Sequence, residues 1–424
     1  MPVRRRTLLG AVVAAAGLTA ACGDQDKPAA DDGTTTLWIW PSGLDDAMVK
    51  QAVRQFAGRT KLSVTTVEGN YQDQLTKALG GPGAPAVAGI KGEDISSVLP
   101  RADLFVDLNT LGARDLQDQY LDWKWRQGST LDNRLVGFPI DTGPTAIFYR
   151  YDLFRKAGLA AEPDDVAVAC KDWAAYLAFG RRLVHKLPSV RLFCNAADLF
   201  SSCVGQGSRR YVNESNHYIG DSDEVRAAWD IAVESLGMGI SAGIFNDDEK
   251  RFPAYEAGAV ASDTGPAWLA QDLQSSAAKS AGTWRVANGC ADGANQGGSF
   301  LSVPAAGSGH DTAFEVIRWL LSPANQAKMF AGAKLFPSAP AAFQMPELLA
   351  PDPFFGGQRT TPVFAASAAK ARLSYEAPSD AAIEQVFITQ LQQLESGAKT
   401  PAAAYRDAVD GGRKLAASKG VLTE

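Results

Sequence analysis

Between positions 34 and 79, short β-rich runs alternate with segments in which apolar residues recur at helical spacing. The β-rich run TTTLWIW, 34–40, is followed by PSG, which predicts a strand and then a turn. In 45–56 the apolar residues recur at helical spacing, and the same strand and helix signals return in KLSVTTVEG, 61–69, and YQDQLTKAL, 71–79. This order of strand, helix, strand and helix indicates parallel pairing in an α/β domain.

The rest of the chain continues as a mixture of helices with few strands. Segments 173–187 and 223–236 have helical patterns, and GSFLSVP, 298–304, predicts one further strand. The segment 311–332 predicts a helix that is interrupted or turned at Pro323, and the C-terminal third is helical and alanine-rich. No internal repeat is present.

The first residues have the pattern of an export signal. A basic start (RRR, 4–6) precedes an apolar stretch, 8–18, that is too short to cross a membrane. RRTLL resembles a twin-arginine signal, and LTAAC resembles a bacterial lipobox in which Cys22 is lipidated, although Leu18 lies one position too far from the cysteine. The alternative is a plain secretory signal that contains Cys22. We therefore expect a signal peptide with lipobox at 1–22 and a flexible, polar tether at 23–35.

Size and charge narrow the class of protein. About 390 residues remain after the tether, more than one hydrophobic core normally supports, so two lobes are expected. The net charge of -6 and the lack of a basic run argue against a nucleic-acid partner. No later segment reaches the roughly 18 apolar residues of a membrane span.

Cysteine and histidine residues give no sign of a metal site. The four cysteines after Cys22 form no CxxC pair, and the three histidines are scattered. An even number of cysteines in an exported protein favours structural disulfides, with three pairings open. The residues concerned are Cys170, Cys194, Cys203 and Cys290.

Five local motifs, in order, carry a resemblance to a known family. They are LWIW after the lipoprotein start, GFPIDTGPTAIFYRYDLFRKAGL (137–159), AADLF (196–200), YEAGAVASDTGPAWLAQDL (255–273), and GGSFLSVP with its helix and SPANQ (297–326). In this series the chain resembles an extracellular solute-binding lipoprotein of a carbohydrate ABC transporter, of the family 1, actinobacterial kind. Three departures concern the ligand more than the fold: PAVA at 85–88 lacks an aspartate, Ser262 replaces a methionine, and Trp268 comes late after GP.

The resemblance implies a fold, a function and partners. The expected fold is α/β and two-lobed, periplasmic-binding-protein-like (type II), with a hinged interlobe cleft. Lobe 1 would comprise 36–144 plus 297–345, and lobe 2 would comprise 145–296 plus 346–424. The chain would capture a mono- or oligosaccharide without chemistry and deliver it to the permease subunits of the transporter. It would act as a monomer without cofactor, on the extracellular face of the cell membrane through its lipid anchor.

The stretch 137–159 places a carboxylate between two prolines just before an apolar run. Pro139 and Pro144 fix φ and keep the segment out of a helix, and Gly143 permits a turn. The resemblance implies that this stretch lies near the interlobe crossover, so that Asp141 projects into the cleft. A carboxylate there accepts hydrogen bonds from sugar hydroxyls, whereas the alternative role is that of a turn cap. Arg150, next to the crossover, is expected to pair with a carboxylate.

A sugar site needs aromatic faces and a few planar polar groups. Trp40 ends the first strand, where ligands gather in α/β sheets, and Trp268 follows the GP turn. Trp284 is balanced between the cleft and the core, while Gly298 and Ser299 are candidates to offer backbone N–H groups to the ligand. The expected ligand-binding residues are Trp40, Glu68, Tyr71, Asp141, Asp263, Gly265, Trp268, Trp284, Gly298 and Ser299.

Two other classes of protein remain as alternatives. A lipid-anchored glycoside hydrolase needs two carboxylates roughly 5 to 9.5 Å apart, and 47 acidic residues always allow such a pair, but no local motif points to one. The P-loop, GxGxxG and HExxH are absent from the sequence. A purely adhesive surface protein is the third class.

Overall fold

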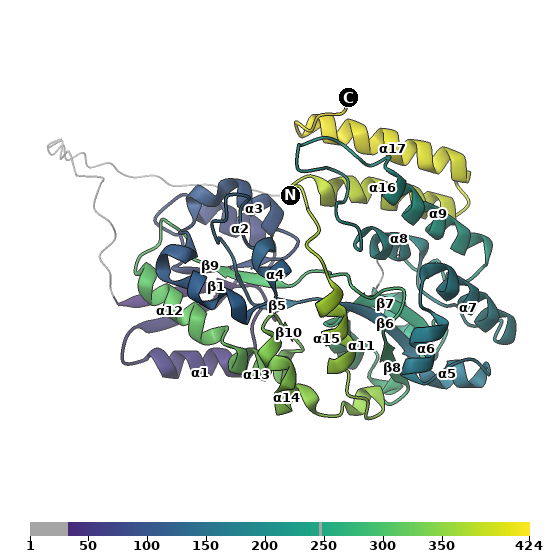
Figure 1. The fold of residues 1–424 in the computed structure, drawn as a ribbon, viewed down its shortest axis with the longest axis horizontal. Coiled ribbons are helices and arrows are strands. Elements are labelled where there is room, and N and C mark those ends of the chain that lie inside the picture. Colours follow the sequence, from purple (N-terminus) through teal and green to yellow (C-terminus); the bar gives the residue numbers. More distant parts are fainter. Residues whose placement is uncertain (1–32, 246–247) are drawn as a thin grey trace, which may run out of the picture.

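The structure, a computed structural model, describes residues 33–245 and 248–424 as two α/β lobes joined by short crossovers (Figure 1). The expected signal peptide, Cys22 and most of the tether lie outside the described residues. The sheet of the first lobe has the order β2-β1-β3-β9-β4. Its strands are β1 Thr34–Ile39, β2 Lys61–Thr66, β3 Val87–Lys91, β9 Ser299–Ser302 and β4 Phe138–Pro139.

The first three strands of this sheet are parallel, as the strand and helix pattern predicts. The strand β9 is antiparallel to both β3 and β4, because it belongs to a segment that returns from the second lobe. Helices cover both faces. One face carries α1 Asp46–Phe56, α12 His310–Leu320 and α13 Pro323–Ala333, and the other carries α2 Tyr71–Ala78 and α3 Ile95–Val98.

Local signals in the sequence set several of these helix ends. Asp45 caps α1 by accepting a hydrogen bond from the Met48 backbone N–H at 2.8 Å. The interruption expected at Pro323 occurs: α12 ends at Leu320 and α13 begins with the proline at its first position.

The second lobe is built around β6 Thr145–Arg150, whose six residues are all buried. It pairs in antiparallel fashion with β7 Ser262–Pro266 on one side and β8 Trp284–Ala287 on the other. Ala146 and Phe148 enter the hydrophobic cluster on one face, while Ile147 and Tyr149 enter the cluster on the opposite face. Since both faces are covered, the strand reads as a continuous apolar run without alternation.

Helices surround the second sheet and form an additional layer beyond it. Phe200, Trp229 and Phe387 form the centre of a cluster between α8 Ala196–Val204, α9 Asp223–Gly237, α16 Asp380–Glu395 and α17 Pro401–Ser418 (Figure 1). The remaining α-helices are α4 Asp122–Gln127, α5 Tyr151–Lys156, α6 Pro163–Ala169, α7 Trp173–Lys186, α10 Asp248–Ala257, α11 Leu269–Ser276, α14 Pro346–Leu349 and α15 Thr361–Lys370. Within the described residues, none of the helices has the length and apolar character that crossing a membrane requires.

The crossover region adds a small two-stranded sheet of β5 Asp141–Thr142 and β10 Phe336–Pro337. The expected lobe boundaries stay a prediction. Within 297–345, Ile317 and Met329 pack in the core of the first lobe, whereas Phe336 and Phe343 pack in the core of the second.

Candidate ligand-binding cleft

Two of the segments that join the lobes are bonded to each other. The Gly143 backbone N–H donates to Asn295 Oδ1 at 2.8 Å, and the Gln296 N–H donates to the Gly143 carbonyl at 2.9 Å. A Cβ at position 143 would lie 1.9 Å from the Gln296 carbonyl oxygen. Glycine is therefore required here by the close approach of two backbones. The backbone φ of Gly143 is not positive, so the close approach, and not a left-handed conformation, accounts for the glycine.

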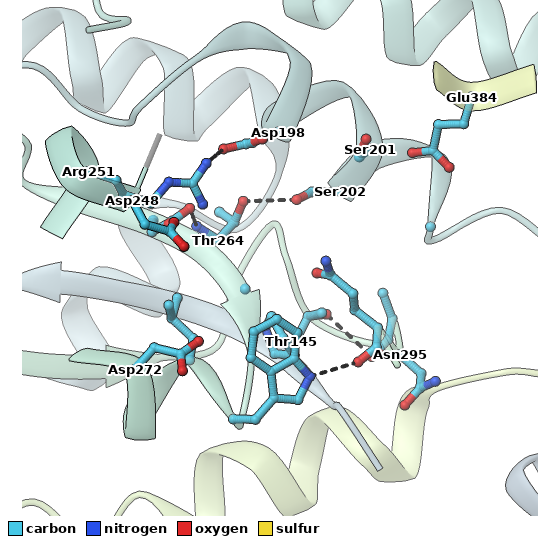
Figure 2. A pocket seen from close by; sticks show the side chains of 18 of the residues that line it. Thr145, Asp198, Ser201, Ser202, Asp248, Arg251, Thr264, Asp272, Asn295 and Glu384 are labelled. Atoms are coloured by element: carbon cyan, nitrogen blue, oxygen red, sulfur yellow. Dashed lines mark hydrogen bonds and ion pairs between the residues drawn. The ribbon is translucent and has the colours of Figure 1, made fainter. Parts of the chain in front are cut away.

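A cavity of about 520 Å³ opens beside these crossovers on the side of the second lobe (Figure 2). Its lining comes from β7, α8, α10, α11, α16 and the segment 294–296. Asp263 and Gly265 of β7 line this cavity together with Trp268. Three of the expected ligand-binding residues thus share one wall.

A second cavity of about 220 Å³ lies against the first lobe. Trp40, Asp141, Gly298 and Ser299 line it, and Trp268 lines it as well. The Trp40 indole follows β1, the position that parallel-strand topology favours for ligands. Gly43 and Gly89 leave room for this ring, because a Cβ at either position would lie 2.8 Å from it.

Trp268 borders both cavities and is bonded to a crossover. The residue precedes α11, and its Nε1 donates to the Gln296 carbonyl oxygen at 3.2 Å. Its side chain is half-buried, so ring surface remains free. The Trp268 indole thus exposes ring surface to the cleft and is at the same time hydrogen-bonded to the backbone of a crossover segment.

Asp141 is 3% exposed and already has partners within the protein. Its Oδ1 accepts a hydrogen bond from the Ser299 N–H at 2.7 Å. Burial raises the pKa of the Asp141 carboxyl, while the nearby charge of Lys124 opposes this shift. Asp141 thus fastens β5 to the start of β9, and only part of it borders the smaller cavity.

Lys124 of α4 is a buried basic residue next to Gly298, which lines the smaller cavity. Lys124 itself lines neither cavity, and sequence reasoning missed it. It is fully buried, its Nζ donates to Gln127 Oε1 at 3.0 Å, and the Nζ lies 3.9 Å from the centroid of the Phe300 ring. Burial lowers the pKa of Lys124 to about 7, against the opposing charge of Asp141. The available signal was the WKW pattern at 123–125, in which a lysine stands between two apolar residues of a short helix.

Charged groups form a network in the wall of the larger cavity. Arg251 forms an ion pair with Asp198, and Tyr255 donates a hydrogen bond to Asp263. Asp263 Oδ1 also accepts from the Thr264 N–H at 2.8 Å. Burial raises the pKa of Asp198 to about 6, and the charge of Arg251 counteracts it. Sequence reasoning proposed Asp263 but missed Asp198 and Arg251, although Asp198 lies within the AADLF motif.

Three expected ligand-binding residues do not reach either cavity. Tyr71 is 2% exposed in the core, where its hydroxyl donates to the Gly89 carbonyl at 2.8 Å. Trp284 is completely buried, and its Nε1 donates to Ser280 Oγ at 2.8 Å. Glu68 is exposed beyond the end of β2. Tyr71 and Trp284 are therefore core residues, and the prediction that they bind the ligand is wrong, because their side chains point into the hydrophobic core.

The structure also tests the predictions of structural disulfides and of an ion pair at Arg150. Cys170, Cys194 and Cys290 are buried free thiols and Cys203 is a half-buried one, so the expectation of structural disulfides is wrong for the described residues. Arg150 forms an ion pair with Asp152 at 2.8 Å, as expected for a residue that pairs with a carboxylate. Within 33–245 and 248–424 no cluster of three or more metal-ligating side chains occurs.

Comparison with known proteins gives both sequence and structural relatives. The model of the bacterial extracellular solute-binding protein family matches residues 51–354. The arabinooligosaccharide-binding protein of Bacillus subtilis (strain 168) is 27% identical over 210 residues, which is 47% of this chain and 46% of that protein. The chain thus matches about half the length of this curated relative.

Solved structures resemble the fold over almost its whole length. An extracellular solute-binding protein of family 1 has a TM-score of 0.83 and 28% identity, with 90% of this chain and 99% of that chain covered. The ABC transporter associated binding protein from B. animalis subsp. lactis Bl-04, in complex with β-1,6-galactobiose, has a TM-score of 0.70 and 20% identity, with 92% and 100% covered. These likenesses show the periplasmic-binding-protein-like fold. From the match over 51–354, the chain belongs to the bacterial extracellular solute-binding protein family.

Proposed function

We propose that this chain is the solute-binding component of an ABC importer and captures a mono- or oligosaccharide between its lobes. The observation that carries the proposal is the position of Trp268, which borders both a 520 Å³ cavity of the second lobe and a 220 Å³ cavity of the first. An indole face suits the C–H face of a sugar ring, and the carboxylates around it suit its hydroxyls. The Ser299 N–H, expected from the sequence to serve the ligand, instead donates to Asp141 Oδ1. The arabinooligosaccharide- and galactobiose-binding relatives support a saccharide ligand.

The residues that we propose to contact the sugar are those that line the two cavities. Trp40 and Trp268 supply aromatic faces, and Gly298 and Ser299 lie at the start of β9 beside Asp141. Asp263 and Gly265 contribute from β7. The proposed cycle is capture by one lobe followed by closure of the other, and the ligand favours the closed form only by its higher affinity for that form.

The proposal also includes the location and the partners of the protein. A lipid anchor at Cys22, export by the twin-arginine route, a monomeric state and delivery to permease subunits follow from the signal-like start and the family. Incorporation of a labelled fatty acid that is lost in Cys22→Ser would support the anchor. A secreted, unlabelled wild-type chain would contradict it.

The central test is a thermal-shift screen of the purified chain over a panel of mono- and oligosaccharides, followed by calorimetry on each saccharide that raises the melting temperature. We expect at least one saccharide to bind and to remain intact on chromatography after prolonged incubation, since we propose no catalytic step. Small-angle scattering should show a smaller radius of gyration in its presence. Absence of binding by every saccharide would refute the transport role, and hydrolysis products would favour the glycoside hydrolase instead.

A further inference from the structure

The charges around the larger cavity are unequal. Five carboxylates line it, against two guanidinium groups. Figure 2 shows the acidic side chains distributed around the cavity instead of grouped at one point. The acidic residues are Asp198, Asp248, Asp263, Asp272 and Glu384, and the basic ones are Arg210 and Arg251.

Both arginines already have acidic partners. Arg251 forms its ion pair with Asp198. Arg210 reaches Glu376 at 2.7 Å and Glu384 at 3.3 Å, and its side chain is only 21% exposed. An anionic ligand that approached either guanidinium would have to compete with carboxylates of the protein that are held in place.

Two carboxylates of the lining have no such compensation. The side-chain carboxylates of Asp272 in α11 and Asp248 at the start of α10 have no hydrogen-bond or ion-pair partner within the part of the chain that the structure describes. Burial, and then the like charge of Asp248, raise the pKa of Asp272 to about 6. At pH 7.5, above this value, the Asp272 carboxylate carries its charge, so the lining holds negative charge that neither arginine compensates.

The lining of the smaller cavity contributes no excess of positive charge that would offset the negative charge of the larger one. Its one lysine in the lining, Lys91, lies 3.7 Å from Glu93, and Asp141 is also part of the wall. A cleft with one sign of charge and low-dielectric walls focuses its field on whatever enters it.

We propose that the cleft selects its saccharide by charge, accepting neutral and amine-bearing sugars and rejecting sugars that carry a carboxylate or sulfate group. The inference rests on the proposed function, because it concerns the ligand of the same cleft. Asp272 and Asp248 are the main determinants, since their charge is not matched within the protein. The opposite possibility is that a sugar acid uses the arginines, whose Nε atoms are buried without a partner among the described residues.

The experiment compares matched forms of one disaccharide that binds in the thermal-shift screen. The forms are the neutral sugar, the same sugar with one terminal CH₂OH oxidised to a carboxylate, and the same sugar with one hydroxyl replaced by an amine. Calorimetry at pH 7.5 and low salt should give a Kd for the carboxylate form at least about tenfold higher than for the neutral form. The amine form should bind at least as well as the neutral form, and 0.5 M NaCl should reduce the discrimination.

Variants separate the local charge from the net charge of the chain. In Asp272→Asn the ratio of the two Kd values, carboxylate to neutral, should fall about threefold or more. The matched control Asp118→Asn removes the same charge from an exposed position outside both cavities, and should leave the ratio unchanged. The melting temperature of each variant shows whether its fold is intact.

The two proposals fail in distinguishable ways. If the carboxylate form binds as tightly as the neutral form or more tightly, charge selection is overturned while the saccharide-binding role stands. If the ratio does not fall in Asp272→Asn, the assignment to this aspartate is overturned. If no form of any saccharide binds, both the proposed function and the charge selection fail.

Discussion

Trp268→Ala is the substitution that tests the cleft most directly. The indole is half-buried and borders both cavities, so its removal should lower saccharide affinity without opening the core. A tryptophan side chain offers roughly 150–250 Å² of surface, of which a stacked sugar ring covers about a third. At about 25 cal/mol per Å², this contact contributes about 1 to 2 kcal/mol, or about a 5- to 30-fold change in Kd.

A second substitution separates stacking from the contact with the crossover. Trp268→Phe keeps an aromatic face but loses the hydrogen bond from Nε1 to the Gln296 carbonyl. If stacking dominates, Trp268→Phe should retain most of the affinity that Trp268→Ala loses. If the bond to the crossover matters for closure, Trp268→Phe should instead diminish the ligand-induced decrease in the radius of gyration.

The assay is isothermal titration calorimetry with the saccharide that gives the largest thermal shift. Trp173→Ala serves as the matched control, because Trp173 is also half-buried but bonds to Gln206 and lines neither cavity. The control should bind the saccharide with wild-type affinity. A Trp268→Ala variant that is folded and binds with unchanged Kd would refute the placement of the ligand between the two cavities.

Three further predictions concern Gly143 in the crossover, the buried Lys124, and the cysteines. Gly143→Ala should lower the free energy of unfolding by about 1 to 3 kcal/mol in urea titrations, since its Cβ would lie 1.9 Å from the Gln296 oxygen. Gly58→Ala, which meets no atom within 4 Å, is its control, and equal effects would contradict the close approach. Because burial lowers the pKa of Lys124 to about 7, the folded state releases a proton that the unfolded state keeps. Stability relative to Lys124→Met should therefore fall as the pH falls from about 10 to 7, by about 1.4 kcal/mol per unit, and parallel stability curves would contradict this. The described cysteines should all react as free thiols in denaturant without prior reduction, and a reductant should not change the melting temperature; fewer reactive thiols would reveal a disulfide.

The sequence alone determined the local elements and the class of fold. The alternation in 34–79 predicts β1, α1, β2 and α2 in order, because strand and helix periods depend on residues next to each other in the chain. The motif series, carried by short segments such as 137–159 and 297–326, indicated the family that the match over 51–354 establishes. The position of Trp40 after a parallel strand likewise follows from local sequence and a general rule of topology.

Only the tertiary structure decided which polar and aromatic residues share a cavity. The sequence predicts Trp284 and Tyr71 as ligand-binding residues alongside Trp268 and Trp40, yet both are core residues because their sides of the elements face packed neighbours. Lys124, Arg251 and Asp198 come from segments far apart in the sequence, and no local pattern shows that their charges meet buried partners. The reason for Gly143 also lies in the fold, since the Gln296 carbonyl that excludes a side chain there belongs to a crossover about 150 residues away.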